Sequence, residues 1–146
     1  MSVGLLDARV KASPTDPGGF TAIASTGQID RDGEVIQPGS LSLPDSVPIH
    51  ADHDLSVSKI IARGRPYYDG KLLMINAKFA TTPDAQLIRQ KVRDGIITNM
   101  SIVFRGIDWK DINGVRTCVN GELLDRPLQH GRPDPVDPLG HGPAVC

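Results

Sequence analysis

Residues 82–107 read TPDAQLIRQKVRDGIITNMSIVFRGI, and this one stretch carries both kinds of regular structure. Its first half predicts a helix over residues 83–94. Thr82 can serve as the N-cap, Pro83 suits the first helical position, and apolar side chains recur at helical spacing. Gly95 then stands where glycine commonly follows the last helical turn. One helix is therefore expected, with a clear beginning and end.

The second half of the stretch predicts a strand over residues 96–107, in which apolar and polar side chains alternate. Met100, Ile102 and Phe104 point to one face, and Ser101 points to the other. The helix and this strand should meet through their apolar stripes. The side chains expected to be buried in this way are Ile88, Val92, Met100, Ile102 and Phe104.

Short β-like runs separated by glycine or proline turns lie on both sides of this stretch. Hairpin turns are expected at Asp69-Gly70, where a type I′ turn fits, and at Asn113-Gly114 and Asn120-Gly121. The fold class predicted is β-rich α+β, either a small β-barrel or an open sheet with one helix packed on it. The other strand candidates are residues 5–11, 20–25, 34–36, 58–65, 71–79, 115–119 and 122–124.

Composition excludes several classes of protein. The chain has 146 residues and a mass of 15.7 kDa, 39% of them hydrophobic and 23% charged, which indicates one folded domain. A formal net charge of −1 argues against a nucleic-acid binder. No apolar run is long enough for a membrane span, and the N-terminus lacks the pattern of a signal peptide. The two cysteines, Cys118 and Cys146, exclude a disulfide framework and favour a reducing cytosol.

The composition changes near the C-terminus. Residues 1–125 contain all the predicted elements, whereas residues 126–146 carry five of the twelve prolines and almost no apolar periodicity. The second segment is expected to be an irregular, poorly packed tail, because proline cannot donate to a strand ladder.

The densest cluster of titratable groups is His50-Ala-Asp-His53-Asp54. Three interpretations stand side by side: a polar surface turn, a metal site, and a catalytic histidine beside a carboxylate. A metal site would need at least one further ligand, and the chain offers none at a recognisable spacing. The run from Asp30 to Ser42 lacks the glycine and the glutamate of a calcium loop, so we treat it as a turn and expect neither a metal nor another cofactor.

Ser101 is the second candidate for chemistry. It is either an ordinary serine on the exposed side of a strand or a nucleophile that a distant histidine activates. The Gly-x-Ser-x-Gly elbow of α/β-hydrolases is absent around it.

Several blocks resemble one family in the same order. Residues 24–36, ASTGQIDRDGEVI, are followed by Pro38-Gly39; residues 48–54 read PIHADHD, and residues 99–104 read NMSIVF. These blocks are similar to the signatures of the caudovirus prohead serine proteases, over roughly residues 20–125.

The resemblance implies a catalytic set and a fold. His53 matches the family's catalytic histidine, Ser101 its nucleophile, and Asp125 is the candidate for the residue that orients the histidine. The implied fold resembles the β-barrel of herpesvirus assemblins with flanking helices. The implied activity is cleavage of scaffold and major capsid precursors within the assembling prohead in the host cytoplasm. Self-cleavage is a further implication of the resemblance. A homo-oligomer is also expected, whereas a nucleic acid, a membrane or a cofactor is not.

The sequence departs from the family in two places. Val103 stands where the family usually has glycine, and the match ends at Asp125, as after a frameshifted or replaced C-terminus. The barrel edge at residues 122–125 is therefore expected to be unpaired. This departure favours an alternative, an inactive protease-fold module that acts in capsid assembly or scaffold binding. A metal-dependent hydrolase that uses His50, Asp52 and His53 is a third.

Overall fold

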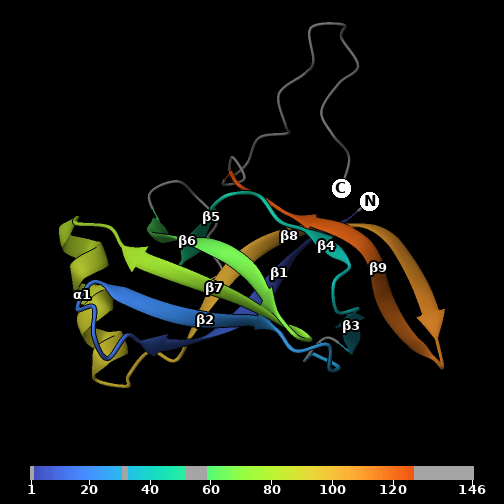
Figure 1. Ribbon diagram of the computed structural model, residues 1–146, viewed down its shortest axis with the longest axis horizontal. Coiled ribbons are helices and arrows are strands. Elements are labelled where there is room, and N and C mark those ends of the chain that lie inside the picture. The colour runs from blue at the N-terminus through green and yellow to red at the C-terminus, as the bar shows by residue number, and fades with distance from the viewer. Residues whose placement is uncertain (1, 31–32, 52–58, 127–146) are drawn as a thin grey trace, which may run out of the picture.

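The computed structural model describes residues 2–30, 33–51 and 59–126 (Figure 1). These ranges contain one helix, α1, and nine strands. Their bounds are β1 Ser2–Ala12, β2 Gly19–Ser25, β3 Glu34–Ile36, β4 Leu41–Ser42, β5 Val47–His50, β6 Ile60–Asp69, β7 Leu72–Phe79, α1 Pro83–Arg93, β8 Asn99–Ile112 and β9 Val115–Leu123.

Six of the strands form a closed antiparallel barrel. The order is β1-β2-β7-β6-β5-β8, and β1 closes the ring because it pairs with β2 along one edge and with β8 along the other. The β-rich fold class is confirmed, and of the two architectures left open the barrel is the one formed.

Three further strands extend the barrel on one side. β9 forms a long hairpin with β8, and both β3 and β4 pair with β9 in parallel. In Figure 1 the tip of the β8–β9 hairpin lies at one end of the molecule and α1 at the other. The parallel pairings join segments that are far apart in the sequence, which local turn signals do not predict.

The barrel interior is the core. Along β1 the side chains of Leu6, Ala8 and Val10 are buried, whereas Asp7 and Arg9 are exposed. Met100, Ile102 and Phe104 are buried as predicted. Alternation of this kind places every second side chain inside a barrel.

The predicted helix is confirmed, and α1 ends one residue earlier than expected. Val92 is buried, whereas Ile88 is only partly buried against the core. The main contacts of α1 are with β1, β6 and β7, and its Val92 belongs to the same core cluster as Met100 and Ile102 of β8. The helix covers one end of the barrel (Figure 1). It is not long and apolar enough to cross a membrane.

Two of the predicted hairpins are present, with one change of turn type. Asn113 and Gly114 have φ of 52° and 82°, as a type I′ turn requires. The β6–β7 hairpin turns instead at Gly70-Lys71, because Asp69 pairs with Leu72. Of these only Gly70 has a positive φ, at 60°, which fits a type II′ turn and corrects the predicted type I′.

The predicted turn at Asn120-Gly121 is wrong, because β9 runs through both residues. Gly121 pairs with Gly106 of β8, and a Cβ built on it would lie 2.5 Å from the carbonyl oxygen of Arg105 and 2.8 Å from Leu41 Cδ2. The glycine is thus needed for close approach of two strands and not for a turn.

The expectation of an unpaired edge at residues 122–125 is wrong at Glu122. Glu122 pairs with Arg105 on one side and with Ser42 of β4 on the other. Leu123 pairs with Phe104, and the Leu124 N–H donates to the Val103 carbonyl at 3.1 Å. The rest of the predicted tail, residues 127–146, lies outside the described residues.

Candidate functional site

Ser101 lies at the centre of a row of three polar residues on neighbouring strands. On β5 its direct partner is His50, and on β1 its direct partner is Asp7. Side chains that are directly opposite in antiparallel strands share one face of the sheet, with Cβ atoms roughly 4.5–5.5 Å apart. The row His50–Ser101–Asp7 therefore crosses three strands of the barrel wall.

The row lies on the outer face of the barrel, because the neighbours of Ser101 on β8, Met100 and Ile102, point inward. Even so, Ser101 is only 2% exposed and His50 is 0% exposed. The interpretation of Ser101 as a solvent-exposed surface serine is therefore wrong. A hydroxyl and an imidazole side by side in a site closed to bulk water are the elements of a nucleophile and its base.

A β-bulge positions His50. Ile49 pairs with Ala62 of β6, but His50 pairs with Ile60, so Ile61 is an extra residue on β6. Bulges of this kind re-aim a side chain and are frequent beside functional sites. The bulge falls where β5 passes from β6 to Ser101 of β8.

The predicted base, His53, lies outside the described residues, together with Asp52. Its proximity to Ser101 stays a prediction, as does the expectation that His50 is the more distant histidine. Within the described ranges no group of three histidine, cysteine, aspartate or glutamate side chains could hold a metal ion.

The predicted orienting residue, Asp125, is close to β8 through its backbone. The hydrogen bond from Leu124 to Val103 brings the chain to the stretch of β8 that holds Ser101. The Asp125 carbonyl accepts a hydrogen bond from Arg63 Nη2 at 3.0 Å. The residue itself is exposed. A third catalytic group is usually held in place by its surroundings, and this arrangement fixes the main chain of Asp125 only.

Two groups that lie away from this row have clearly shifted pKa values. Burial raises the pKa of Tyr68, whose hydroxyl donates to the Leu41 carbonyl at 2.8 Å and so ties β4 to the barrel. Burial likewise raises the pKa of the Cys118 thiol. Both shifts favour the neutral, unreactive form, so these two residues serve packing.

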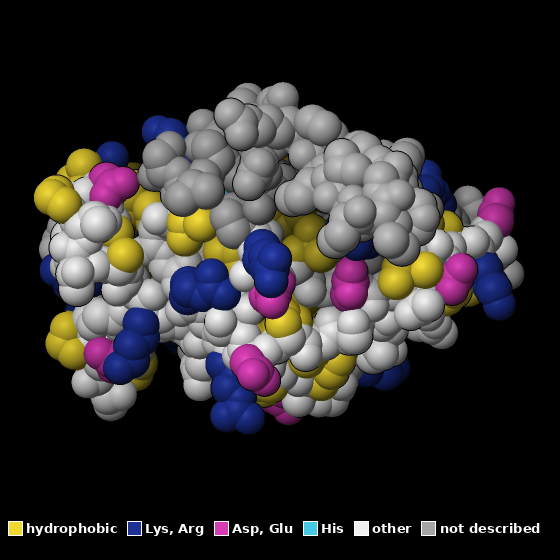
Figure 2. All heavy atoms as spheres, turned by 90° about the horizontal axis from the view of Figure 1, so that it is seen from above, with side chains coloured by type: hydrophobic (Ala, Val, Ile, Leu, Met, Phe, Trp, Pro, Cys, Tyr) yellow, Lys and Arg dark blue, Asp and Glu magenta, His cyan; other side chains and the backbone are white. Residues whose placement is uncertain are grey.

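Figure 2 shows the charges of the described side chains on one face of the molecule. Basic and acidic side chains are interspersed there, in keeping with a formal net charge of −1.

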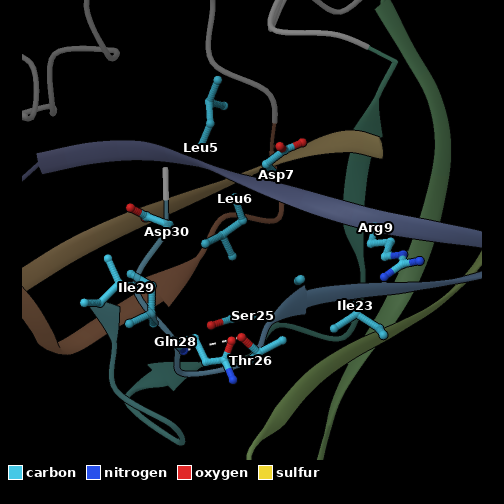
Figure 3. Close-up of a pocket in the computed structure, with 12 residues that line it drawn as sticks. Leu5, Leu6, Asp7, Arg9, Ile23, Ser25, Thr26, Gln28, Ile29 and Asp30 are labelled. Atoms are coloured by element: carbon cyan, nitrogen blue, oxygen red, sulfur yellow. Dashed lines mark hydrogen bonds between the residues drawn. The ribbon is translucent and has the colours of Figure 1, made fainter. Parts of the chain in front are cut away.

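A cavity of about 660 Å³ opens beside the row (Figure 3). It lies between β1 and residues 25–30, and Asp7 belongs both to its lining and to the row. Sequence reasoning missed Asp7 and the place of His50. The alternation of β1 around Leu6, Ala8 and Val10 was the available signal that Asp7 faces outward with Arg9.

Comparisons of this chain with protein-family models, with curated proteins and with solved structures find no match.

Proposed function

We propose that this chain is a serine endopeptidase of the caudovirus prohead type, with Ser101 as its nucleophile. The observation that carries the proposal is the buried Ser101, which has His50 directly opposite it on β5. The resembling block PIHADHD places a second histidine, His53, three residues further along. A closed barrel with one helix is also in keeping with the assemblin-like fold that the resemblance implies.

The chemistry is acyl transfer. His53 takes the proton from Ser101 Oγ as Oγ attacks the scissile carbonyl carbon, giving a tetrahedral intermediate. The C–N bond then breaks, and the same histidine gives its proton to the leaving amine. Water attacks the acyl-enzyme in the second half and releases the new carboxylate and free Ser101. Asp125 orients the histidine, and no cofactor takes part.

The substrates that the resemblance implies are scaffold and major capsid precursors inside the assembling prohead, with cleavage of the chain itself as a further event. The chain would act there in the host cytoplasm, as a homo-oligomer.

A second candidate function is an inactive protease-fold module that binds scaffold during capsid assembly. The exposed position of Asp125 favours it, because an unsupported third residue leaves the histidine poorly oriented. Loss of that orientation costs about 10⁴ in kcat in a serine protease of known mechanism.

The test is cleavage of a scaffold-fused capsid protein by the purified chain, with and without a chelator. Ser101→Ala and His53→Ala should both abolish cleavage, and the chelator should have no effect. Cleavage that survives Ser101→Ala would overturn the proposal. Binding of the scaffold without any cleavage would support the inactive module.

A matched pair of variants distinguishes the roles of the two histidines. His53→Gln should abolish cleavage, whereas His50→Gln should lower it and leave the pH profile of kcat/KM in place. If His50→Gln alone removes the basic group that the pH profile reports, His50 is the general base and the assignment of His53 is wrong.

A further inference from the structure

The N-terminal half of β1 has one edge without a partner strand in the described part of the chain. β1 pairs with β8 from Ser2 to Arg9, but with β2 only from Arg9 to Ala12. The edge over residues 5–7 therefore borders the cavity and not another strand.

One hydrogen bond shows which residues of β1 direct their backbone N–H and C=O groups toward β8. The Val10 N–H donates to the Thr98 carbonyl at 2.8 Å, on the β8 side. In an antiparallel ladder the hydrogen-bonding groups alternate between the two edges. The even residues of β1 thus bond to β8, and the N–H and C=O groups of Val3, Leu5 and Asp7 point to the open edge.

The edge is open because β2 turns away from β1. A register shift between Ile23 and Ser25 interrupts the pairing of β2 with β7, and such irregularities bend a strand. Gly27, with φ of 80°, then continues the turn. Figure 3 shows Ser25, Thr26 and Gln28 on the far side of the cavity from β1.

The resulting groove has an apolar floor, and its walls carry both polar and apolar side chains. Leu6, Ala24 and Ile36, all buried members of the core, form the floor. Thr26 and Gln28 stand in the opposite wall, where the Gln28 N–H donates to Thr26 Oγ1 at 3.3 Å. A volume of about 660 Å³ lies within the range of ligand pockets, roughly 300–1,000 Å³. A second hollow of about 240 Å³ shares Leu5 with the first and extends the groove along β1.

We propose that this groove binds an extended segment of the protein substrate, which adds to β1 as a further strand. Backbone donors and acceptors at strand spacing are complementary to an extended polypeptide, and an apolar floor accepts every second side chain. This identification of the occupant rests on the proposed endopeptidase function.

The groove lies close to the proposed nucleophile without containing it. Asp7 is the direct partner of Ser101, so a strand added to β1 lies two strand spacings, roughly 10 Å, from Ser101. The bound segment therefore flanks the scissile bond by a few residues. Its role is to hold the substrate beside Ser101.

The test uses the Ser101→Ala chain, which leaves peptides intact, and a pool of capped heptapeptides randomised at alternate positions. Amide hydrogen exchange is measured by NMR with and without the pool. The amides of Leu5 and Asp7 should exchange about tenfold more slowly with peptide, because they gain strand hydrogen bonds. The amides of Leu6 and Ala8 already bond to β8 and should not change.

Two controls make the result specific. The same pool methylated at every backbone nitrogen should give no protection, since it cannot form a strand ladder. Leu5→Pro should remove the protection at Asp7 while the amide of Leu6 stays protected; if this variant fails to fold, the methylated pool still decides.

Several outcomes would overturn the inference: no protection at Leu5 and Asp7, equal protection by the methylated pool, or protection that rises with protein concentration alone. The last would show that a second copy of the chain fills the groove. Protection at Leu5 and Asp7 in a chain that never cleaves protein would support the groove and overturn the endopeptidase. Ser101-dependent cleavage without protection would do the reverse.

Discussion

Phe104 anchors the junction between β8 and β1. Its ring occupies the space left by Gly4, where a Cβ would lie 2.7 Å from Phe104 Cε1, and it packs near Trp109 at a centroid distance of 6.3 Å. Phe104→Ala should lower the free energy of unfolding by about 3–5 kcal/mol, because it leaves a cavity in the core. Chemical denaturation measures this. The control is Ile112→Ala on the same strand, where the side chain is 42% exposed and a change of less than about 1 kcal/mol is expected.

Asp84 gives the start of α1 a pH dependence. The Thr82 hydroxyl and then the Ala85 N–H hydrogen-bond to its carboxylate and lower the pKa of Asp84. A pKa that is lower in the folded state stabilises the fold above the unfolded-state pKa of about 4. That contribution is lost as the pH falls through the folded-state pKa.

Asp84→Asn should therefore lower the melting temperature near neutral pH, and the difference from the unaltered chain should shrink as the pH falls below about 4. Thermal unfolding of both proteins over this range is the measurement. A difference that stays constant with pH would contradict the assignment to the carboxylate charge.

The candidate site shows how far individual residues could be predicted. The face of Met100, Ile102 and Phe104 followed from alternation alone, because the period of a strand is a local property. That His50 lies opposite Ser101 could not be predicted, because it depends on a bulge in β6 and on the register between strands about fifty residues apart.

The two asparagine–glycine pairs of the β8–β9 region have different structures. Asn113-Gly114 makes the hairpin turn, and Asn120-Gly121 lies within β9. The same dipeptide occurs in both, because close packing against the neighbouring strands requires a glycine at position 121, whatever its preference for a turn. Sequence patterns predicted α1 and the turn at Asn113-Gly114, because both depend on residues that are close together in the chain. They did not predict the parallel pairing of β3 and β4 with β9, which joins distant segments.

Gly121→Ala should destabilise the protein by about 1–3 kcal/mol, because its Cβ would meet the Arg105 backbone, which cannot move without breaking the ladder. Gly18→Ala is the matched control: its Cβ would meet only Asp16 Oδ1, at 3.8 Å. Denaturant midpoints of the two variants give the comparison. Equal stability of the two would mean that β9 tolerates a wider spacing from β8 than the structure has.

Closure of the barrel brings together parts of the chain that are far apart in the sequence. β1 bridges β2, which follows it directly, and β8, which begins nearly a hundred residues later. Such long-range pairing makes the fold depend on its first strand. The six-strand ring is complete within the described residues.

Because that ring is complete, removal of residues 127–146 should change little. The hydrogen bond from Arg63 to the Asp125 carbonyl and the pairing of Leu123 with Phe104 both lie before the cut. The melting temperature should shift by no more than about 4 °C, equivalent to about 1 kcal/mol for a chain of this size. Removal of residues 2–8 is the matched deletion: it opens the ring between β2 and β8 and should abolish cooperative unfolding. A large fall in melting temperature on loss of 127–146 would show that these residues complete the core, and residues 1–126 would then not be a sufficient folding unit.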